Sequence, residues 1–459
     1  MTSIAPEIFK AYDIRGIVDR TLTEEAAETI GRALATMGKA RGVTRFVVGR
    51  DGRLSGPRLS KALARGLNAA GAGVIDIGVV ATPMVYFATH LFETGSGVMV
   101  TGSHNPPEYN GLKMMVAAET LAAEAIQDLR RAIEKGEFAK GAGAYETADV
   151  SGPYLDRIAS GVKLARPMTI AIDCGNGSPG AFAPKLYRRL GCEVIELFCE
   201  VDGNFPNHHP DPSKPENLKD LVAALARTRA EIGLAFDGDG DRLGVVTKTG
   251  KIIFPDRQLM LFAEEVLTRN AGAEIIFDVK CTRNLFPWIR EHGGKPLMWK
   301  TGHSLIKAKL KETGAPLGGE MSGHIFFKDR WYGFDDGLYA GARLLEIVSR
   351  APDASAVLEA LPDSISTPEL NVALDREGEN HALIAQLQKT ARFEGATEIN
   401  TIDGLRVEYP DGFGLMRASN TTPVIVLRFE ADTRQGLARI QGDFKRVLSS
   451  AKPGLSLPY

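Results

Sequence analysis

Short apolar runs, each bounded by Gly or Asp, recur through the first two-thirds of the chain. They cover residues 45–49, 73–78, 96–102, 168–173, 193–198, 232–238 and 274–279. Runs of this length are typical of strands buried on both faces of a parallel sheet. Segments with helical spacing of apolar residues lie between them, at 22–38, 56–70, 179–190, 217–229 and 256–268. Because strand and helix alternate, the pattern predicts an α/β fold.

The pattern changes near residue 367, where strands come first. A helix follows at 379–392, then a strand near 404–409, a Gly-rich turn, a strand at 424–429 and a final helix. This order predicts an α+β unit unlike the units before it. Aperiodic or turn-forming segments at 136–150, 248–251 and 363–368 separate the units. We therefore expect three similar mixed α/β domains and a C-terminal α+β domain, at 1–147, 148–250, 251–364 and 365–459.

Composition narrows the class of protein. Of the 459 residues, 44% are hydrophobic and 24% are charged, as in ordinary globular proteins. The net charge of −2 provides no overall field that would attract nucleic acid or anionic lipid. The N-terminus lacks the pattern of a signal peptide, and the apolar segment 79–92 is too short to span a membrane. We expect a cytoplasmic protein whose four cysteines, with no CxxC pair, stay reduced.

Three aspartates, Asp237, Asp239 and Asp241, alternate with glycines directly after an apolar run. On an extended segment they project to the same side, and their mutual repulsion favours a bound cation. Carboxylate oxygens suit Mg²⁺ or Mn²⁺. A calcium-binding EF-hand loop would need Gly and Glu where Arg242 and Lys248 stand, so that alternative fails. A simple polar turn is the other alternative, but the position after a sheet strand favours a metal site.

The segment 101–107, TGSHNPP, also follows an apolar run. Gly102 and the two prolines predict a rigid, exposed loop with Ser103 near its tip, where a substrate could reach a nucleophilic hydroxyl. His104 and Lys113 are the nearby groups that could activate the serine. The flanking residues do not form the GxSxG elbow of a hydrolase. A solvent-facing Ser-His pair without a function is the alternative.

Two further loops carry groups that bind sugars or phosphates. In GGEMSGH, at 318–324, the residues Glu320, Ser322 and His324 offer an acceptor, a hydroxyl and an imidazole for vicinal sugar hydroxyls. In RASNTTP, at 417–423, a guanidinium stands beside hydroxyls and an amide, a set that binds phosphate. Each segment could instead be an ordinary turn.

A GxGxxG match at 175–180 follows another apolar run, and Glu200 lies about twenty residues further on. This spacing is found in dinucleotide-binding folds. Pro179 does not suit that turn, and a single match of this kind is weak evidence. A structural turn between a strand and a helix explains the segment equally well.

Together, these loops resemble the α-D-phosphohexomutase superfamily, specifically its bacterial phosphomannomutase/phosphoglucomutase branch. The resemblance rests on TGSHNPPEYNGLK at 101–113, DGDGDR at 237–242, GEMSGH at 319–324 and RASNTTP at 417–423. Similar segments extend it over nearly the whole chain: FKAYDIRG at 9–16, FPNHHPDPSKPENL at 205–218, DVKCTRNL at 278–285 and KTGHSLIK at 300–307. The resemblance implies four domains around a central active-site cleft, each supplying one loop.

The resemblance also implies roles for individual residues. It implies a phosphoserine and a site for one Mg²⁺, formed by Ser103, Asp237, Asp239 and Asp241. It implies sugar contacts by Glu320 and Ser322, and a phosphate clamp of Arg417, Ser419, Asn420 and Thr421. The general acid/base stays open among His104, Lys113, Lys280 and His324. Substrate contacts match Tyr12, Arg15, Lys280, His303 and His324, while Asn105 and Arg242 match supports of the cleft or phosphoserine.

The activity implied by the resemblance is a phosphohexomutase that moves phosphate between O6 and O1 of mannose or glucose. Ser103 would relay the phosphoryl group through a hexose 1,6-bisphosphate. Met321 stands where the phosphoglucosamine branch tends to carry Gln, which favours mannose and glucose. A phosphoglucosamine mutase, a phosphatase and a non-catalytic phosphosugar-binding protein are the alternatives. We expect a monomer whose partners are small phosphosugars, with no nucleic acid or membrane partner.

Overall fold

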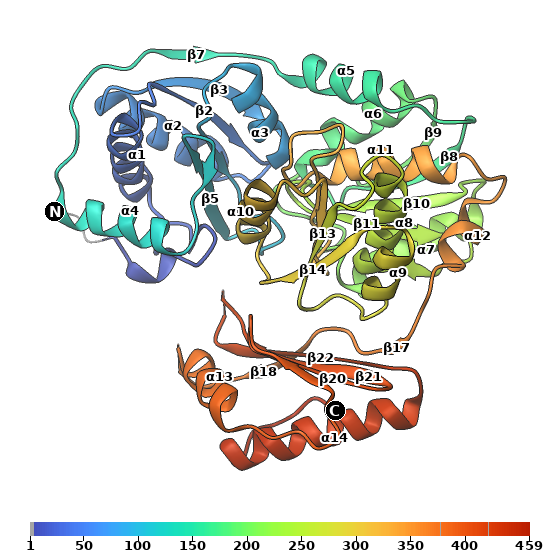
Figure 1. The fold of residues 1–459 in the computed structure, drawn as a ribbon. Coiled ribbons are helices and arrows are strands. Elements are labelled where there is room, and N and C mark those ends of the chain that lie inside the picture. The colour runs from blue at the N-terminus through green and yellow to red at the C-terminus, as the bar shows by residue number, and fades with distance from the viewer. Residues whose placement is uncertain (1–3, 377, 421) are drawn as a thin grey trace.

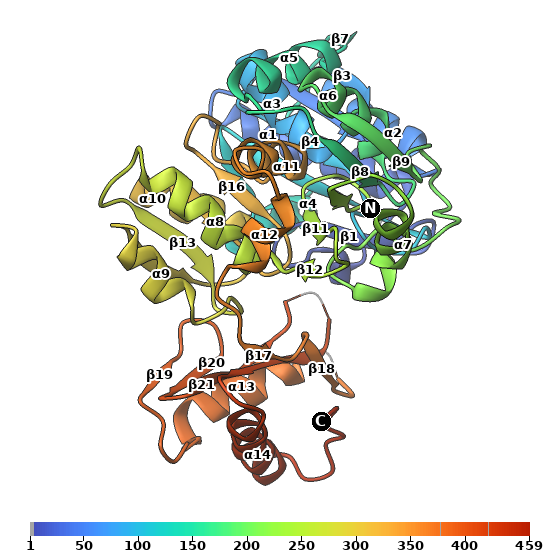
Figure 2. The same cartoon turned by 90° about the vertical axis from the view of Figure 1, so that its right-hand side faces the viewer.

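The computed structural model describes residues 4–376, 378–420 and 422–459. In this part of the chain the strands form four sheets, which follow one another along the sequence. Figure 1 shows helices packed against each sheet, and the C-terminal unit below the other three. The view in Figure 2 shows the same separation of the C-terminal unit. The predicted fold class, mixed α/β units followed by an α+β unit, is confirmed.

The first sheet has the strand order β1-β5-β4-β2-β3-β7, with β6 beside β5. Strands β2, β3, β4 and β7 are parallel, whereas β5 runs antiparallel to both of its neighbours, β4 and β1. Its strands are β1 (Ile14–Ile17), β2 (Arg45–Arg50), β3 (Gly73–Val79), β4 (Gly97–Val100), β5 (Tyr109–Val116), β6 (Glu119–Thr120) and β7 (Tyr145–Thr147). Its helices are η1 (Pro6–Ile8), α1 (Glu24–Lys39), α2 (Gly56–Ala69), α3 (Thr82–Leu91) and α4 (Glu124–Lys135). The predicted linker at 136–150 therefore supplies an edge strand, β7.

The second sheet has the order β12-β11-β10-β8-β9, in which β8, β9 and β10 are parallel and β11 is antiparallel to β10. Its strands are β8 (Thr169–Asp173), β9 (Glu193–Leu197), β10 (Ile232–Phe236), β11 (Leu243–Thr247) and β12 (Ile252–Ile253). Its helices are α5 (Ser151–Gly161), η2 (Ser178–Ala181), α6 (Ala183–Arg189), η3 (Pro215–Leu218) and α7 (Lys219–Arg227). The aspartate loop joins β10 directly to β11.

The third sheet has the order β14-β13-β15-β16, with β16 antiparallel to β15. Its strands are β13 (Glu274–Asp278), β14 (Lys295–Trp299), β15 (Leu317–Gly319) and β16 (Ile325–Phe327). Its helices are α8 (Pro255–Leu267), α9 (Leu285–Glu291), α10 (His303–Thr313), α11 (Gly337–Val348) and α12 (Ala354–Glu359). In all three sheets the candidate loop therefore occupies the same place, between a strand of the parallel core and an antiparallel neighbour.

The C-terminal sheet has the order β17-β22-β21-β20-β19, with β18 also beside β22, and the pairs within it are antiparallel. Its strands are β17 (Ile365–Ser366), β18 (Leu370–Ala373), β19 (Glu398–Asn400), β20 (Leu405–Tyr409), β21 (Gly412–Ala418) and β22 (Val424–Ala431). The helices are α13 (Glu379–Thr390) and α14 (Arg434–Ala451). The predicted turn after 409 is limited to residues 410–411, and the glycines at 412 and 414 lie in the central strand β21. At Gly414 a Cβ atom would lie 2.4 Å from the Phe444 ring of α14, so glycine here allows the helix to pack closely.

The hydrophobic cores divide the molecule unevenly. One apolar cluster runs from α3 of the first unit through the second and third units. The C-terminal unit has its own cluster, and a small group of Val279, Phe413 and Leu415 connects it to the third unit. Among the described residues, no helix combines the length and the apolar character that a membrane crossing requires. The domain boundaries at 147, 250 and 364 stay a prediction.

Candidate active site

Ser103 begins the turn that follows β4, and its backbone φ of +50° lies in the left-handed region. Its backbone N–H donates to Thr101 Oγ1 at 2.7 Å. Its hydroxyl lies 3.0 Å from Asp237 Oδ2 and 3.1 Å from His104 Nδ1. The predicted exposed loop is wrong at this residue, because Ser103 is only 2% exposed. The aspartate loop of the second unit packs directly against it and covers it.

Arg53 holds the serine loop in place, and the sequence reasoning missed it. Its buried guanidinium donates to four backbone carbonyls, those of Ser103 (2.8 Å), Asn105 (2.5 Å), Pro106 (2.6 Å) and Tyr109 (3.0 Å). A Cβ on Gly102 would lie 2.4 Å from its Cζ, which explains the glycine before the serine. The signal that could have found it is a cationic residue shortly after the apolar run at 45–49.

Arg15 makes a second support from strand β1. It donates to the carbonyl of Gly102 at 2.8 Å and to the side-chain oxygen of Asn105, and it pairs with Asp13. The predicted Arg15 and Asn105 therefore contact each other and the serine loop. His104, in the same loop, is partly buried, and burial together with nearby cations such as Arg242 holds its imidazole pKa well below the usual value.

The three aspartates of the second unit form a fully buried cluster whose carboxylate oxygens lie within 4.8 Å of one another. Lys113, which lies on β5, donates to Asp239 Oδ2 at 2.7 Å and to Asp241 Oδ2. Burial and the two neighbouring carboxylates raise the pKa of Asp237 well above its usual value. Burial opposes the charge on Lys113, but Asp239 and Asp241 outweigh it and raise the lysine pKa.

This cluster fits a hard divalent cation. Asp239 Oδ1 is buried and, among the described residues, accepts no hydrogen bond. The donors around it are carboxylate oxygens and the hydroxyl of Ser103, which are the ligands that Mg²⁺ prefers. A cation here would relieve the repulsion that raises the Asp237 pKa. The four residues predicted as metal ligands are therefore brought together from two units, 134 positions apart in sequence for Ser103 and Asp237.

His324 ends the loop between β15 and β16 and connects several acidic groups. Its Nδ1 lies 2.8 Å from Ser322 Oγ and 3.3 Å from Glu320 Oε2, and its Nε2 lies 3.3 Å from Asp241 Oδ1. Arg242 Nε also reaches Nε2, at 3.4 Å. Burial opposes protonation of the imidazole, but Asp241 outweighs it and raises the pKa of His324 to about 9.

Tyr12 and His303 line the space between the first, third and fourth units. The Tyr12 hydroxyl donates to the carbonyl of Thr301 at 2.6 Å and accepts a hydrogen bond from Asn420. The rings of Tyr12 and His303 meet edge to face at 6.2 Å. The Nδ1 of His303, the first residue of α10, lies 3.6 Å from Asp335 Oδ2. The predicted residues Tyr12, His303 and Asn420 are thus neighbours.

The predicted phosphate clamp begins at the end of β21, with Arg417, and continues into the loop before β22. Arg417 Nε donates to Asp403 at 3.0 Å, while its buried NH2 group has no hydrogen-bond acceptor among the described residues. The Ser419 hydroxyl lies 3.0 Å from that of Thr422, and Asn380 donates to the Ser419 carbonyl at 2.9 Å. The predicted Thr421 lies outside the described residues. A guanidinium edge without a partner is suited to an anion.

Lys280 lies away from the serine and the aspartates. Its ammonium donates to Glu369 Oε1 at 2.6 Å and lies 3.8 Å from Asp278 Oδ2. Burial opposes its charge, but these two carboxylates outweigh it and raise the pKa of Lys280. Of the four groups considered for the general acid/base, Lys280 is therefore the one bound at the junction with the C-terminal unit.

The GxGxxG segment supports the aspartate loop. The backbone N–H of Ser178 donates to the carbonyl of Gly238 at 2.9 Å, and a Cβ on Gly177 would meet Gly238 at 2.8 Å. The segment thus packs behind the aspartate loop as a structural turn that follows β8 and continues into η2. Of the two interpretations of this motif, a dinucleotide-binding loop and a structural turn between a strand and a helix, the structure favours the turn.

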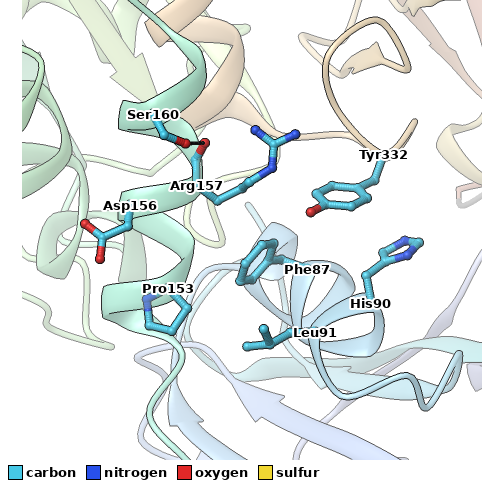
Figure 3. A pocket seen from close by; sticks show the side chains of 8 residues that line it. All are labelled: Phe87, His90, Leu91, Pro153, Asp156, Arg157, Ser160 and Tyr332. Carbon is cyan, nitrogen blue, oxygen red and sulfur yellow. Dashed lines mark hydrogen bonds between the residues drawn. The ribbon is translucent and has the colours of Figure 1, made fainter.

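A hollow of about 610 Å³ lies elsewhere on the surface, between α3, α5 and the segment after β16 (Figure 3). It is lined by Phe87, His90, Leu91, Pro153, Asp156, Arg157, Ser160 and Tyr332. His90 and Tyr332 stack at 4.7 Å, and Arg157 lies over the Tyr332 ring. None of these residues belongs to the predicted site, so the hollow is separate from the serine and aspartate loops.

Comparisons with known proteins agree with this geometry. The phosphoglucomutase/phosphomannomutase α/β/α domain I, II and III families match residues 6–140, 152–250 and 254–365, and the C-terminal domain family matches residues 369–447. A phosphoglucomutase from Neisseria gonorrhoeae is 64% identical over 452 residues, which cover 98% of each chain. A phosphomannomutase/phosphoglucomutase from Pseudomonas aeruginosa is 57% identical over 458 residues, 100% of this chain and 98% of the relative.

Structural similarity extends over the same length. The crystal structure of a phosphoglucomutase/phosphomannomutase family protein from Burkholderia thailandensis has a TM-score of 0.95 to this structure, at 60% identity, and each chain is covered completely. All four domain families match in order, and the relatives cover the chain from end to end. The protein belongs to the phosphoglucomutase/phosphomannomutase family.

Proposed function

We propose that the protein is a phosphomannomutase/phosphoglucomutase, an isomerase that interconverts hexose 6-phosphates and hexose 1-phosphates. The observation that carries the proposal is the contact of the Ser103 hydroxyl with Asp237, at 3.0 Å, within a buried carboxylate cluster. Family membership, a phosphomannomutase/phosphoglucomutase at 57% identity and a phosphoglucomutase at 64% identity support it. Mannose and glucose phosphates are the proposed substrates.

The proposed reaction has two phosphoryl transfers. Phosphorylated Ser103 gives its phosphoryl group to the free hydroxyl of a hexose monophosphate, so the bond to Oγ breaks as the bond to the sugar oxygen forms. The sugar hydroxyl loses its proton to a base. The resulting hexose 1,6-bisphosphate reverses its orientation and returns its other phosphoryl group to Ser103. The same bisphosphate added from outside would rephosphorylate a Ser103 that has lost its phosphate, and so act as an activator.

The residues around the serine support this division of work. Asp237, Asp239, Asp241 and Ser103 would hold one Mg²⁺, which neutralises charge on the transferred phosphoryl group when bound. Arg53 and Arg15 fix the serine loop through its carbonyls and Asn105. His104, with a depressed pKa and its Nδ1 3.1 Å from Oγ, is the proposed group that exchanges the proton.

The sugar and its second phosphate would occupy the space between the third and fourth units. Glu320, Ser322 and His324 present polar groups suited to sugar hydroxyls, beside Lys280, His303 and Tyr12. The clamp residues Arg417, Ser419, Asn420 and Thr421 would bind the phosphate that is not being transferred. The buried NH2 group of Arg417, which has no acceptor among the described residues, supports this role. Because the sugar must bind in two orientations, phosphate contacts rather than sugar contacts would fix it.

The proposal is tested by the isomerisation of mannose 1-phosphate, glucose 1-phosphate and glucosamine 1-phosphate with Mg²⁺ and a hexose 1,6-bisphosphate. We expect turnover of the first two sugars and an intact-protein mass that shows a phosphoryl group. Dominant turnover of the amino sugar would assign a phosphoglucosamine mutase instead. Net release of phosphate from a protein without a phosphoryl group would indicate a phosphatase. Binding without turnover would indicate a non-catalytic protein.

A further inference from the structure

A second group of potential metal ligands lies beside the aspartate cluster. Asp241, His324 and Asp335 are buried, and one ligand atom from each lies within 4.8 Å of the others. Asp335 follows β16, and it lies in none of the loops considered above. Unlike the aspartate cluster, this group contains an imidazole nitrogen. Its donor atoms therefore suit a cation of a different kind.

The free oxygens of both aspartates face the imidazole. Lys113 occupies Asp241 Oδ2, and Lys307 donates to Asp335 Oδ1 at 2.9 Å. The other oxygens, Asp241 Oδ1 and Asp335 Oδ2, lie 3.3 Å and 3.9 Å from His324 Nε2, and neither has a hydrogen-bond donor among the described residues. Each lysine therefore donates a hydrogen bond to one oxygen of its carboxylate, and the other oxygen of each carboxylate lies toward His324 Nε2.

The opposite side of the imidazole is fixed by further polar groups. His324 Nδ1 lies 2.8 Å from Ser322 Oγ and 3.3 Å from Glu320 Oε2. A carboxylate that accepts from one ring nitrogen orients the other toward a metal, as in carboxylate-histidine-zinc arrangements. Glu320 is itself fixed by the backbone N–H of Gly302, at 2.5 Å. The imidazole is thus held with Nε2 toward the two aspartates.

The spacing is near that of a small tetrahedral ion. Bonds of about 2.0–2.1 Å in a tetrahedron separate ligand atoms by about 3.3 Å. Asp241 Oδ1 lies at that distance from His324 Nε2, whereas Asp335 Oδ2, at 3.9 Å, must move closer to share an ion with it. His303 Nδ1 also lies 3.6 Å from Asp335 Oδ2 and accepts or donates no hydrogen bond among the described residues. Mixed nitrogen and oxygen ligands favour Zn²⁺ and similar ions over Mg²⁺.

We propose that Asp241, His324 and Asp335 form a second cation site, specific for a borderline transition metal such as Zn²⁺, beside the Mg²⁺ site. Asp241 belongs to both groups, and Lys113 must leave its Oδ2 when both sites are occupied, because only Oδ1 is without a donor among the described residues. An ion here must displace Arg242 Nε, which reaches His324 Nε2 at 3.4 Å, and it must release to solvent the proton that the neighbouring carboxylates keep on the imidazole. It would also immobilise the imidazole beside the proposed sugar position. Its occupation therefore inhibits the enzyme, and only this consequence rests on the proposed function.

The test uses Co²⁺ as the probe, because its visible absorption reports four-coordinate geometry and its X-ray absorption spectrum reports imidazole ligation. The full-length protein, saturated with Mg²⁺, is titrated with Co²⁺. We expect one Co²⁺ per chain, with a histidine signature and strong visible bands. Asp335→Asn should weaken this binding at least about tenfold. Asp237→Asn is the matched control, since it removes an oxygen from the Mg²⁺ site alone and should keep the Co²⁺ spectrum.

Circular dichroism shows whether Asp335→Asn folds. If it does not fold, His324→Gln is the second variant, and this substitution should abolish the histidine signature in the X-ray absorption spectrum. Oxygen-only coordination in the Mg²⁺-saturated protein would overturn the proposal, as would unchanged Co²⁺ affinity in both variants. Inhibition is read separately, as loss of turnover on adding Zn²⁺ at saturating Mg²⁺. If no mutase activity exists, the Co²⁺ spectra still decide the binding site. Full activity with the site occupied would contradict the inhibition.

Discussion

The first three units and the C-terminal unit are attached to the molecule by different kinds of contacts. A single apolar cluster connects α3 with the second and third units. The junction with the C-terminal unit is mainly polar: Arg406 donates to the carbonyls of Val279 and Cys281 at 2.7 Å, and Lys280 pairs with Glu369. Among the described residues, the apolar cluster that joins the third unit to the C-terminal sheet is small.

This difference separates the part of the site that transfers the phosphoryl group from the part that binds the second phosphate. The serine and aspartate loops lie within the fused units, where shared apolar burial resists relative movement. The clamp lies on the unit held by polar contacts, which water can replace when the unit moves. We infer that the first three units form a rigid platform for phosphoryl transfer and that the C-terminal unit adjusts to either end of the sugar. Four predictions test this contrast.

The largest effect is expected from Ser103→Ala on the platform. Removing the hydroxyl removes the phosphoryl relay, so kcat should fall about 10⁴-fold or more. Steady-state isomerisation of glucose 1-phosphate measures it, together with intact-protein mass. Ser160→Ala, an exposed serine on α5, is the control and should keep near-normal turnover. Substantial turnover of Ser103→Ala would contradict the relay.

Removal of divalent cations should lower the activity and the thermal stability of the platform. The stability of the C-terminal unit should not change. Chelation with EDTA should lower turnover about 10²–10³-fold, because several kcal/mol of charge stabilisation are lost. Mg²⁺ at one hundred times its Kd should stabilise the platform by about 2.7 kcal/mol. Calorimetry with and without Mg²⁺ checks this. If Mg²⁺ raised the melting temperatures of the platform and of the C-terminal unit by the same amount, the two parts would not be independent units.

Arg417→Lys should weaken substrate binding with little change in stability. A lysine cannot make the bidentate hydrogen bonds that a guanidinium makes to phosphate. Because one charged hydrogen bond is lost, KM should rise about 10–100-fold. The control is Arg439→Lys in the same unit, where the arginine pairs with Asp411 at the surface. KM and kcat are measured for both variants. A loss confined to kcat would place Arg417 in the chemistry rather than in the clamp.

The smallest effect is expected at the junction, from Glu369→Gln. The variant leaves the buried Lys280 with only the more distant carboxylate of Asp278, at 3.8 Å, and should destabilise the attachment of the C-terminal unit by about 1–2 kcal/mol. Calorimetry should then resolve a separate transition. Asp432→Asn, at the exposed pair with Arg283 across the same junction, should change stability by less than about 1 kcal/mol. A single unchanged transition in Glu369→Gln would argue against a polar hinge.

The local pattern of apolar and polar residues was sufficient to predict many of the strands. The parallel strands at β2, β3, β8, β10 and β13 were predicted within a residue or two, because buried runs ending in Gly or Asp have few other interpretations. The strand β21 was missed, since glycines at 412 and 414 weaken strand propensity. They are tolerated because Ile440 and Phe444 of α14 fill the space above them. Only the packing of a helix from further along the chain supplies that reason.

The candidate site shows the same division. The chemical groups of each loop were readable from sequence, since metal ligands and phosphate donors must be particular residue types. Arg53 was not found, because its function is to hold carbonyls of a loop that lies about fifty residues further along the chain. Nor did the spacing reveal that Asp335 lies beside His324 and Asp241.

The sequence by itself determined the class of each unit, the loops that carry chemistry and the kinds of groups they contain. Tertiary structure alone decided that Ser103 is buried against Asp237, that Lys113 enters the aspartate cluster, and that Lys280 turns to the C-terminal junction. The physical reason is that local pattern depends on neighbours along the chain. Contact between loops from different units depends on how their sheets pack.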